Sequence, residues 1–314
     1  MKLQMQSKQT HQTHTGAHTL LRALFRRSQG TLAALLALGL LPCTMAAVNT
    51  EWTNPGVGNW NDPNNWSNGV PPAPVEGYYS EDTFYISNGG TAHVGNGETI
   101  SVMEGMLYNN STLELTDGVT ISVAYRLFVD TGGHLVIGPG SVTMDTSLTL
   151  GGIDRGALHF AADSHLDLTG SLRIESGAAL DFTWGVTAAG SPFMSIGGDS
   201  HYTIWDFVSG KTAINLNGFQ AGAWELISGI TGDGEWSGAY MGDDEHAYSI
   251  YALFEDGSVD HLIDYTGDNA LAATFYLEGG SLFVSLTAVP EPATWATLAG
   301  LALLAWAALL RRRA

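Results

Sequence analysis

A short pattern of alternating apolar and polar residues recurs through the middle of the chain. It reads Thr-Leu-Glu-Leu from residue 112, His-Leu-Val-Ile from 134, Ala-Leu-His-Phe from 157 and Ala-Leu-Asp-Phe from 179. The four starts lie 22, 23 and 22 residues apart. Alternation with a period of two predicts β-strands with one buried face. The nearly constant spacing predicts a structural repeat.

Two further sets of short strands follow almost the same spacing. They cover residues 126–129, 147–150 and 171–174, and residues 119–121, 142–144 and 165–167. Three short strands per turn, separated by Gly, Asp or Ser, are typical of a β-solenoid, whose rungs bury their apolar faces against one another. We therefore expect an all-β fold with a right-handed parallel β-helix over residues 101–185. A meander or sandwich of hairpins is the alternative, because strands every 8–12 residues suit that architecture too.

The repeat also predicts which side chains face inward. Large apolar residues occupy the second and fourth positions of the first set of strands, and they should form stacked columns inside the coil: Leu113, Leu115, Leu135, Ile137, Leu158, Phe160, Leu180 and Phe182.

The residues on either side of the repeat differ from it in composition. Residues 48–100 carry Trp52, Trp60 and Trp66 among Asn, Gly and Pro, whereas residues 186–288 contain longer aromatic strands. An open solenoid end is an exposed sheet edge, so we expect an N-terminal cap over the first region and a C-terminal β cap over the second. The three tryptophans are also candidate glycan contacts, because aromatic rings can stack on sugars.

The flanking regions resemble a known group of proteins. The run from Gly58 to Trp66, followed by Asn88-Gly89-Gly90-Thr91, is similar to the leading module of autotransporter-like β-helix proteins. The segment 224–229 is similar to their closing module. The resemblance implies a β-helix between two capping modules.

The first 47 residues have the pattern of a secretory signal with a long n-region. Arg22, Arg26 and Arg27 precede an uncharged apolar run from Leu32 to Leu41, and small residues follow it. Cleavage is expected after Ala46 or Ala47. The pattern predicts export through the Sec translocon and processing by signal peptidase.

The other end of the chain combines three features in order. Val289-Pro290-Glu291-Pro292 comes first, an uncharged stretch of 18 residues over 293–310 follows, and Arg311, Arg312 and Arg313 come next. Eighteen helical residues reach about 27 Å, enough to cross the core of a bilayer. The arginines would place the C-terminus in the cytoplasm. We expect a transmembrane helix in this segment.

This order of motif, apolar span and arginine cluster over 289–314 resembles the PEP-CTERM sorting signal. The resemblance implies that an exosortase, a membrane transpeptidase-like protease, processes the tail near Pro290–Pro292. The protein would be anchored in the membrane only transiently, and would then be released or attached outside the cell. It implies nothing about the activity of the mature part.

Charge and cysteine content limit the function of the central region. Residues 48–289 contain only four basic residues, Arg126, Arg155, Arg173 and Lys211, against thirty acidic ones. Such a surface repels phosphates, so we expect no nucleic-acid partner. The single cysteine, Cys43, lies inside the signal region, so the mature chain would contain no disulfide and no thiolate metal site.

Few residues offer catalytic or metal-binding chemistry. Asp163, His165 and Asp167 alternate along one strand, where they could act in acid–base catalysis or ligate a cation, although a solvent-facing strand explains them too. The loop from Asp243 to His246 lacks the spacing of known calcium loops. Gly-x-Ser-x-Gly, His-Glu-x-x-His and phosphate-loop motifs are absent from the sequence. We expect no catalytic residue, no metal and no cofactor.

The preferred hypothesis is a non-catalytic cell-surface or extracellular-matrix protein, associated with exopolysaccharide or biofilm. A carbohydrate-binding protein that uses the tryptophans is an alternative. A polysaccharide-degrading enzyme is another, and carboxylates converging in a groove beside Arg155 or Arg173 would favour it.

Overall fold

The chain divides into two units, Met1–Ala46 and Ala47–Ala314, and only the second contains described residues. The computed structural model describes residues 49–71, 73, 83–151, 156–175, 177–185, 191–197, 203–205, 211–230, 263–268, 270–289 and 292–311. The signal region, with Ala46 and Ala47, lies outside them.

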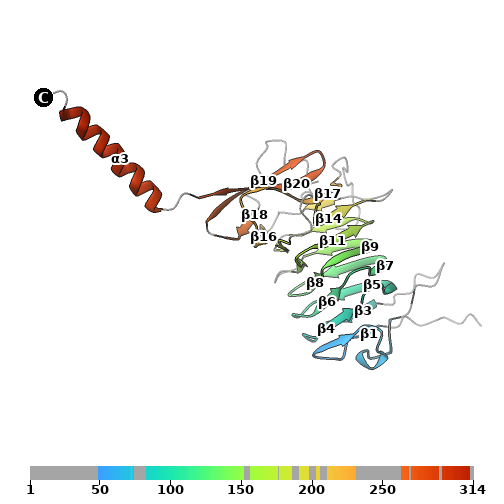
Figure 1. The fold of residues 1–314 in the computed structure, drawn as a ribbon. Helices are drawn as coiled ribbons and strands as arrows, with labels where there is room; N and C mark the ends of the chain where they lie inside the picture. The colour runs from blue at the N-terminus through green and yellow to red at the C-terminus, as the bar shows by residue number, and fades with distance from the viewer. Residues whose placement is uncertain are drawn as a thin grey trace, which may run out of the picture. The chain divides into compact units, whose positions relative to one another are not determined.

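Eight short strands form one of two sheets, here called the short-strand sheet (Figure 1). In spatial order they are β2 (Val57–Asn59), β4 (Thr91–Val94), β6 (Thr112–Leu115), β8 (His134–Ile137), β10 (Ala157–Phe160), β13 (Ala179–Thr183), β16 (Thr212–Asn217) and β18 (Ile263–Thr266). All seven pairings in this sheet are parallel. The four strands of the first predicted set are β6, β8, β10 and β13, in consecutive positions.

The other sheet, here called the long-strand sheet, contains twelve of the described strands. They are β1 (Thr50–Glu51), β3 (Thr83–Ile86), β5 (Thr99–Leu107), β7 (Thr120–Val129), β9 (Gly140–Leu150), β11 (Ser164–Leu168), β12 (Leu172–Ile174), β14 (Met194–Ile196), β15 (Thr203–Trp205), β17 (Gly222–Ser228), β19 (Leu271–Glu278) and β20 (Ser281–Ala288). A 3-10 helix, Pro63–Asn65, lies between β2 and β3.

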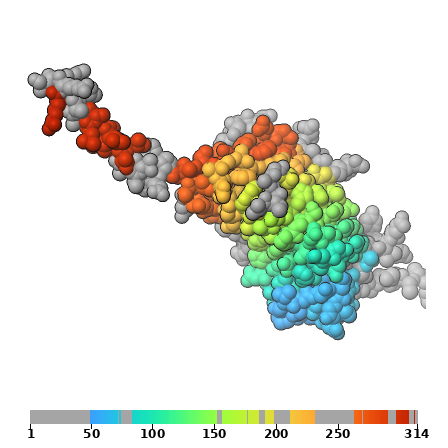
Figure 2. Space-filling model, in the orientation of Figure 1, coloured from blue at the N-terminus to red at the C-terminus, as the bar shows by residue number. Residues whose placement is uncertain are grey.

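The chain coils by alternating between the two sheets. Through the described rungs from β3 to β14, each strand pairs in parallel with the strand one rung earlier and one rung later. Figure 2 shows these rungs as bands of colour that follow one another in chain order. The expectation of an all-β fold with parallel pairing is therefore confirmed, and the alternative of consecutive hairpins does not describe these rungs.

The second and third predicted sets of strands are two parts of the same long strands. The pairing of β7 with β9 breaks between Ser122 and Arg126, and the parts on either side of the break correspond to the two sets. In the next rung the same two parts are separate strands, β11 and β12, and both pair with β9. The break is a β-bulge or irregularity, which bends a strand without ending it.

One strand of the third set is shifted by a residue from its expected alignment. The sequence spacing aligns Val142 with His165, whereas the structure pairs Val142 with Leu166. A slip of one residue exchanges the two faces of a strand. The observed register buries Leu166 and Leu168 and leaves His165 and Asp167 on the outer side, so hydrophobic burial determines the alignment here.

The predicted inward columns lie in the core. Leu113 pairs with Leu135, which pairs with Leu158, and all of these side chains are fully buried. The fourth positions of the same strands form a second inward column, in which the rings of Phe160 and Phe182 are stacked with centroids 5.1 Å apart. Each rung thus covers the apolar face of the next, which a single rung cannot bury by itself.

Two glycines mark places where successive turns of the backbone approach closely. A Cβ at Gly156 would overlap the carbonyl oxygen of Val129, and a Cβ at Gly170 would overlap that of Thr146. Because those neighbours are backbone atoms, they cannot rotate away, so only glycine fits.

Parallel pairing extends beyond the 101–185 range expected from the spacing. It begins with β1 and β3 on one side and reaches β17 and β18 on the other. The order then changes, because β17 pairs with β20 in an antiparallel manner and β20 pairs likewise with β19. This hairpin occupies the last positions of the long-strand sheet.

The tail contains the helix that the sequence predicts after Pro290-Glu291. Helix α3 spans Pro292–Arg311. Among the residues that the structure describes, no helix is long and apolar enough to cross a membrane. The expected transmembrane span over 293–310 is therefore not confirmed.

The buried column gives a direct test of the register. We expect Leu135→Asp to unfold the coil, because an unpaired carboxylate in this position costs several kcal/mol. Val136→Asp is the matched control, since Val136 lies on the outer side of the same strand. Denaturant unfolding followed by circular dichroism should show a lost or greatly lowered transition for the first variant only. Equal stability of the two variants would contradict the assigned faces.

Candidate functional site

The three candidate glycan contacts, Trp52, Trp60 and Trp66, lie inside the first rungs. Their exposed fractions are 2%, 1% and 4%. The ring of Trp66 meets those of Trp52 and Trp60 edge to face, with centroids 4.9 and 4.8 Å apart. The indole N–H of Trp66 donates to the carbonyl oxygen of Trp60 at 2.8 Å.

This packing is the one expected of a cap. Trp60 also packs edge to face on Phe84 of β3, at 5.0 Å between centroids. Sugar stacking requires exposed ring faces, and these three rings turn their faces to one another and to the core. The burial therefore does not fit a direct contact with glycan.

His165 and Asp167 form a small polar group with Ser195 on the outer side of the long-strand sheet. His165 Nε2 lies 2.9 Å from Asp167 Oδ1 and 3.4 Å from Ser195 Oγ. His165 Nδ1 faces the carbonyl oxygen of Pro192 at 2.7 Å. Asp163 precedes the strand in a left-handed turn, with φ of 59°.

The arrangement does not match a nucleophilic triad. In a triad the carboxylate and the hydroxyl contact different ring nitrogens of the histidine, so that the ring can carry a proton between them. Here both contact Nε2, while a backbone carbonyl takes the other nitrogen. The group bridges neighbouring rungs, and it lacks the geometry for covalent catalysis.

The remaining candidate residues do not come together in a metal site among the described residues. Within the described parts of the chain, no group of three or more His, Cys, Asp or Glu side chains is placed to hold a metal ion. Arg173 pairs with Glu175 at 3.0 Å. Arg155 and the Asp243–His246 loop lie outside the described residues.

The segment expected to be a sorting motif, residues 289–292, falls partly within the described residues. Val289 is 46% exposed after β20, and Pro292 begins helix α3. Pro290 and Glu291 lie outside the described residues, as do Arg312 and Arg313, whereas Arg311 is exposed at the end of the helix.

A row of polar side chains on the outer side of the short-strand sheet was not singled out by the sequence. His134 Nδ1 lies 2.8 Å from His159 Nε2, and His159 Nδ1 lies 2.6 Å from Asp181 Oδ2. The other oxygen of Asp181 accepts a hydrogen bond from the amide of Asn215. These residues come from β8, β10, β13 and β16, so one continuous network crosses four neighbouring strands.

The surroundings shift the pKa of two members of this row. Burial lowers the pKa of His134 below 6.5, the adjacent His159 lowers it further, and the charge of Asp181 opposes both. Burial by itself would raise the pKa of Asp181, but hydrogen bonds from His159 and Asn215 and the nearby histidines outweigh it, so this pKa lies below 3.8. At neutral pH, therefore, Asp181 is ionised and His134 is neutral.

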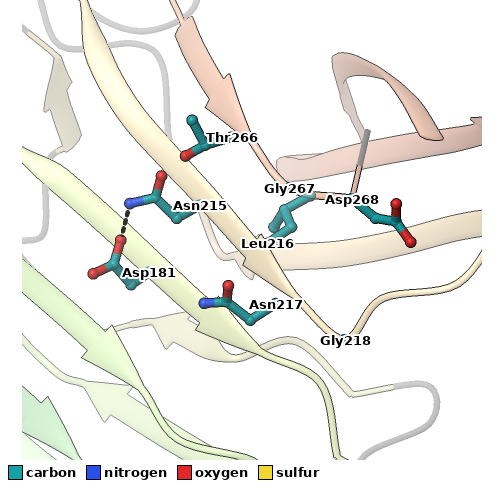
Figure 3. A pocket seen from close by; sticks show the side chains of 8 residues that line it. All are labelled: Asp181, Asn215, Leu216, Asn217, Gly218, Thr266, Gly267 and Asp268. Atoms are coloured by element: carbon teal, nitrogen blue, oxygen red, sulfur yellow. Dashed lines mark hydrogen bonds between the residues drawn. The ribbon is translucent and has the colours of Figure 1, made fainter. Parts of the chain in front are cut away.

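An open cleft lies at the end of this row that is formed by Asp181 and Asn215. It has a volume of about 610 Å³ and is lined by Asp181, Asn215, Leu216, Asn217, Gly218, Thr266, Gly267 and Asp268 (Figure 3). The lining comes from β13, β16 and β18 and from the turns that follow β16 and β18. We take this cleft, with the row behind it, as the candidate functional site.

A second, smaller cavity of about 210 Å³ lies among aromatic side chains near the closing hairpin. It is lined by Trp184, Ser191, Phe193, Ala223, Trp224, Glu225 and Phe283. The rings of Trp184 and Trp224 are 4.2 Å apart and inclined at 54°. These rings pack mainly on one another and extend the core, so the cavity offers few polar groups for a ligand.

The sequence holds one signal for the polar row. His159 and Asp181 occupy the third, outward position of two strands in the recurring pattern, and Asn215 aligns with Asp181. Outward polar residues are expected on any solvated strand, so they carried no functional meaning until the register placed them side by side.

Comparison with known proteins adds no relative to this description. No family model, curated protein or solved structure matches the chain.

The burial of Trp60, in the region expected to be a cap, predicts a large loss of stability on truncation. Trp60→Ala should lower the free energy of unfolding by about 3–5 kcal/mol, as large core truncations do. Chemical denaturation of the purified variant measures this loss. Trp224→Ala, near the other end of the coil, serves as the comparison for a partly buried tryptophan. Unchanged stability of the Trp60 variant would contradict the role of cap.

The polar row predicts a dependence of stability on pH. Because the folded state holds His134 with a lowered pKa, it binds fewer protons than the unfolded chain, and stability should fall as the pH drops below 6.5. The lowered pKa of Asp181 adds a second loss as the pH drops below 3.8. Thermal unfolding between pH 7 and pH 5 should therefore depend less on pH in His134→Gln. His93→Gln is the matched variant, because it replaces another histidine of the same sheet, the one that pairs with Glu114. An identical pH dependence in wild type and His134→Gln would refute the assignment.

Proposed function

We propose that this chain is an exported, exosortase-sorted bacterial protein of the cell surface or extracellular matrix, and that its role is non-catalytic. Its body would be a right-handed parallel β-helix, closed by a tryptophan-rich N-terminal cap and a C-terminal β cap. In this proposal the protein works as a rigid extracellular scaffold, associated with exopolysaccharide.

The stack of rungs is the observation that carries the proposal. The described inward columns of the short-strand sheet, from Leu113 to Phe182, consist of apolar side chains. The charged groups that the structure describes lie outside, and several of them pair between neighbouring rungs, as His93 does with Glu114 and Arg126 with Glu104. Such ladders stabilise a long surface and leave little of it arranged for catalysis.

The charge of the central region supports an extracellular role. Thirty acidic residues against four basic ones keep such a body soluble and apart from anionic surfaces. Phosphate-rich partners such as nucleic acids are disfavoured by the same charge.

The two ends of the sequence support the route. The signal region before Ala46 and Ala47 would direct the chain to the Sec translocon and signal peptidase. The tail over 289–314 would hold it transiently in the membrane, with its C-terminus in the cytoplasm, until an exosortase acts near Pro290–Pro292.

Replacement of Pro290, Glu291 and Pro292 by alanine tests the sorting proposal in the native host. We expect the variant to keep its tail and stay in the membrane fraction, whereas the wild-type protein reaches the surface or the medium with a shortened C-terminus. Mass mapping of the C-terminal peptide, beside fractionation of the cells, gives both readouts. Thr287→Ala, an exposed change just upstream in β20, is the control. If the C-terminus of the triple variant is the same as that of wild type, the tail is not read as proposed.

A further inference from the structure

The cleft on the short-strand sheet has the size of a ligand site and a mainly polar lining. Its volume of about 610 Å³ falls within the range of about 300–1,000 Å³ that is common for ligand sites. Figure 3 shows the side chains of Asp181, Asn215 and Asn217 along its lining, with Thr266 and Asp268 on the neighbouring segment. Leu216 is almost fully buried, with 2% of its surface exposed, so polar groups make most of the accessible lining.

The Asp181 part of the lining is held in place before any ligand arrives. Asp181 is fixed by contacts on both oxygens, one with His159 and the other with Asn215. His159 is fixed in turn by His134. A carboxylate whose orientation is already set loses little freedom when it accepts hydrogen bonds from a ligand.

The lining continues on β18, where Thr266 aligns with Asn215 as Asn215 aligns with Asp181, and on the turn that follows β18. A Cβ at Gly267 would overlap the ring and hydroxyl of Tyr265, so the tyrosine lies directly against this turn. Burial and the charge of Asp268 raise the pKa of Tyr265, whose ring packs against the core beside Phe275. Gly218, with φ of 75°, provides a tight turn without a side chain at the end of β16.

The chemistry of the lining selects among ligand classes. None of the eight described lining residues is basic, so nothing there would neutralise a phosphate, a sulfate or a uronate. Only two of them, Asp181 and Asp268, are carboxylates, fewer than a metal site built from acidic and histidine ligands requires. Carboxylate and amide oxygens accept hydrogen bonds, while amide and hydroxyl groups also donate them. Such a mixture matches a ligand rich in neutral hydroxyl groups.

We propose that this cleft binds a neutral saccharide through polar groups on three neighbouring segments: Asp181 of β13, Asn215 and Asn217 of β16, and Thr266 and Asp268 at the end of β18. The inference deepens the proposed function, on which it rests for the source of the ligand, an extracellular polysaccharide. The binding itself depends only on the cleft.

The full-length chain can be titrated calorimetrically with cellohexaose, xylohexaose, mannohexaose and maltohexaose, beside hexagalacturonate as the anionic counterpart. At least one neutral hexasaccharide should bind, and hexagalacturonate should bind more weakly than that sugar. Asn217→Ala and Asp181→Asn should each weaken binding about tenfold, the effect of losing one or two hydrogen bonds to a ligand. Asn217 is exposed, so its truncation should not disturb folding.

Glu114→Gln is the matched control for Asp181→Asn. Glu114 lies on the outer side of the same sheet and pairs with His93 at 3.2 Å, as Asp181 pairs with His159, but it is remote from the cleft along the stack. It should bind the sugar as wild type does. The thermal transition of each variant establishes that it is folded.

Three results would overturn the inference: no binding of any neutral hexasaccharide, binding that both cleft variants retain, or stronger binding of hexagalacturonate. None of them depends on the tail. A failure of binding with normal processing at Pro290–Pro292 would therefore refute the cleft and leave the sorting proposal intact, and the converse result would do the opposite.

Discussion

The register of the parallel strands determines almost everything else in this protein. Leu113, Leu135, Leu158 and Leu180 are paired in succession, so one alignment repeated from rung to rung creates the inward column. A shift of one residue in any strand would expose its apolar side chains and bury its polar ones. Backbone hydrogen bonds alone do not distinguish the two alignments; burial of the leucine and phenylalanine columns does.

The same register organises the outer surface. Residues that lie 21 or more positions apart become neighbours when they occupy the same place in successive rungs. His159 and Asp181 meet in this way, and so do Glu104 and Arg126. The outer side is therefore a set of polar columns, and the properties of each residue depend on those above and below it. The ionised Asp181 and the neutral His134 are products of that stacking.

The sequence was informative where the spacing was regular. Strands from Thr112 to Thr183 could be located because each carries its own alternation and recurs at nearly constant intervals. Later strands were harder to align, since Asp181 pairs with Asn215 across 34 residues. The tryptophan cap could be proposed from composition, but the burial of its rings depends on packing against Phe84. The cleft could not be predicted from the sequence. It forms only because β16 and β18 lie beside β13, which brings together Asn215, Asn217 and Thr266.

The number of residues between paired positions differs from rung to rung, and this has a consequence for the evolution of such a chain. Because alignment is fixed by the strands and not by the length of chain between them, a turn can lengthen from 22 to 34 residues without moving the columns. Insertions in the loops between strands need not disturb the columns, because surface loops tolerate them. A chain built in this way can acquire new surface features one turn at a time, and the architecture beneath them is inherited unchanged.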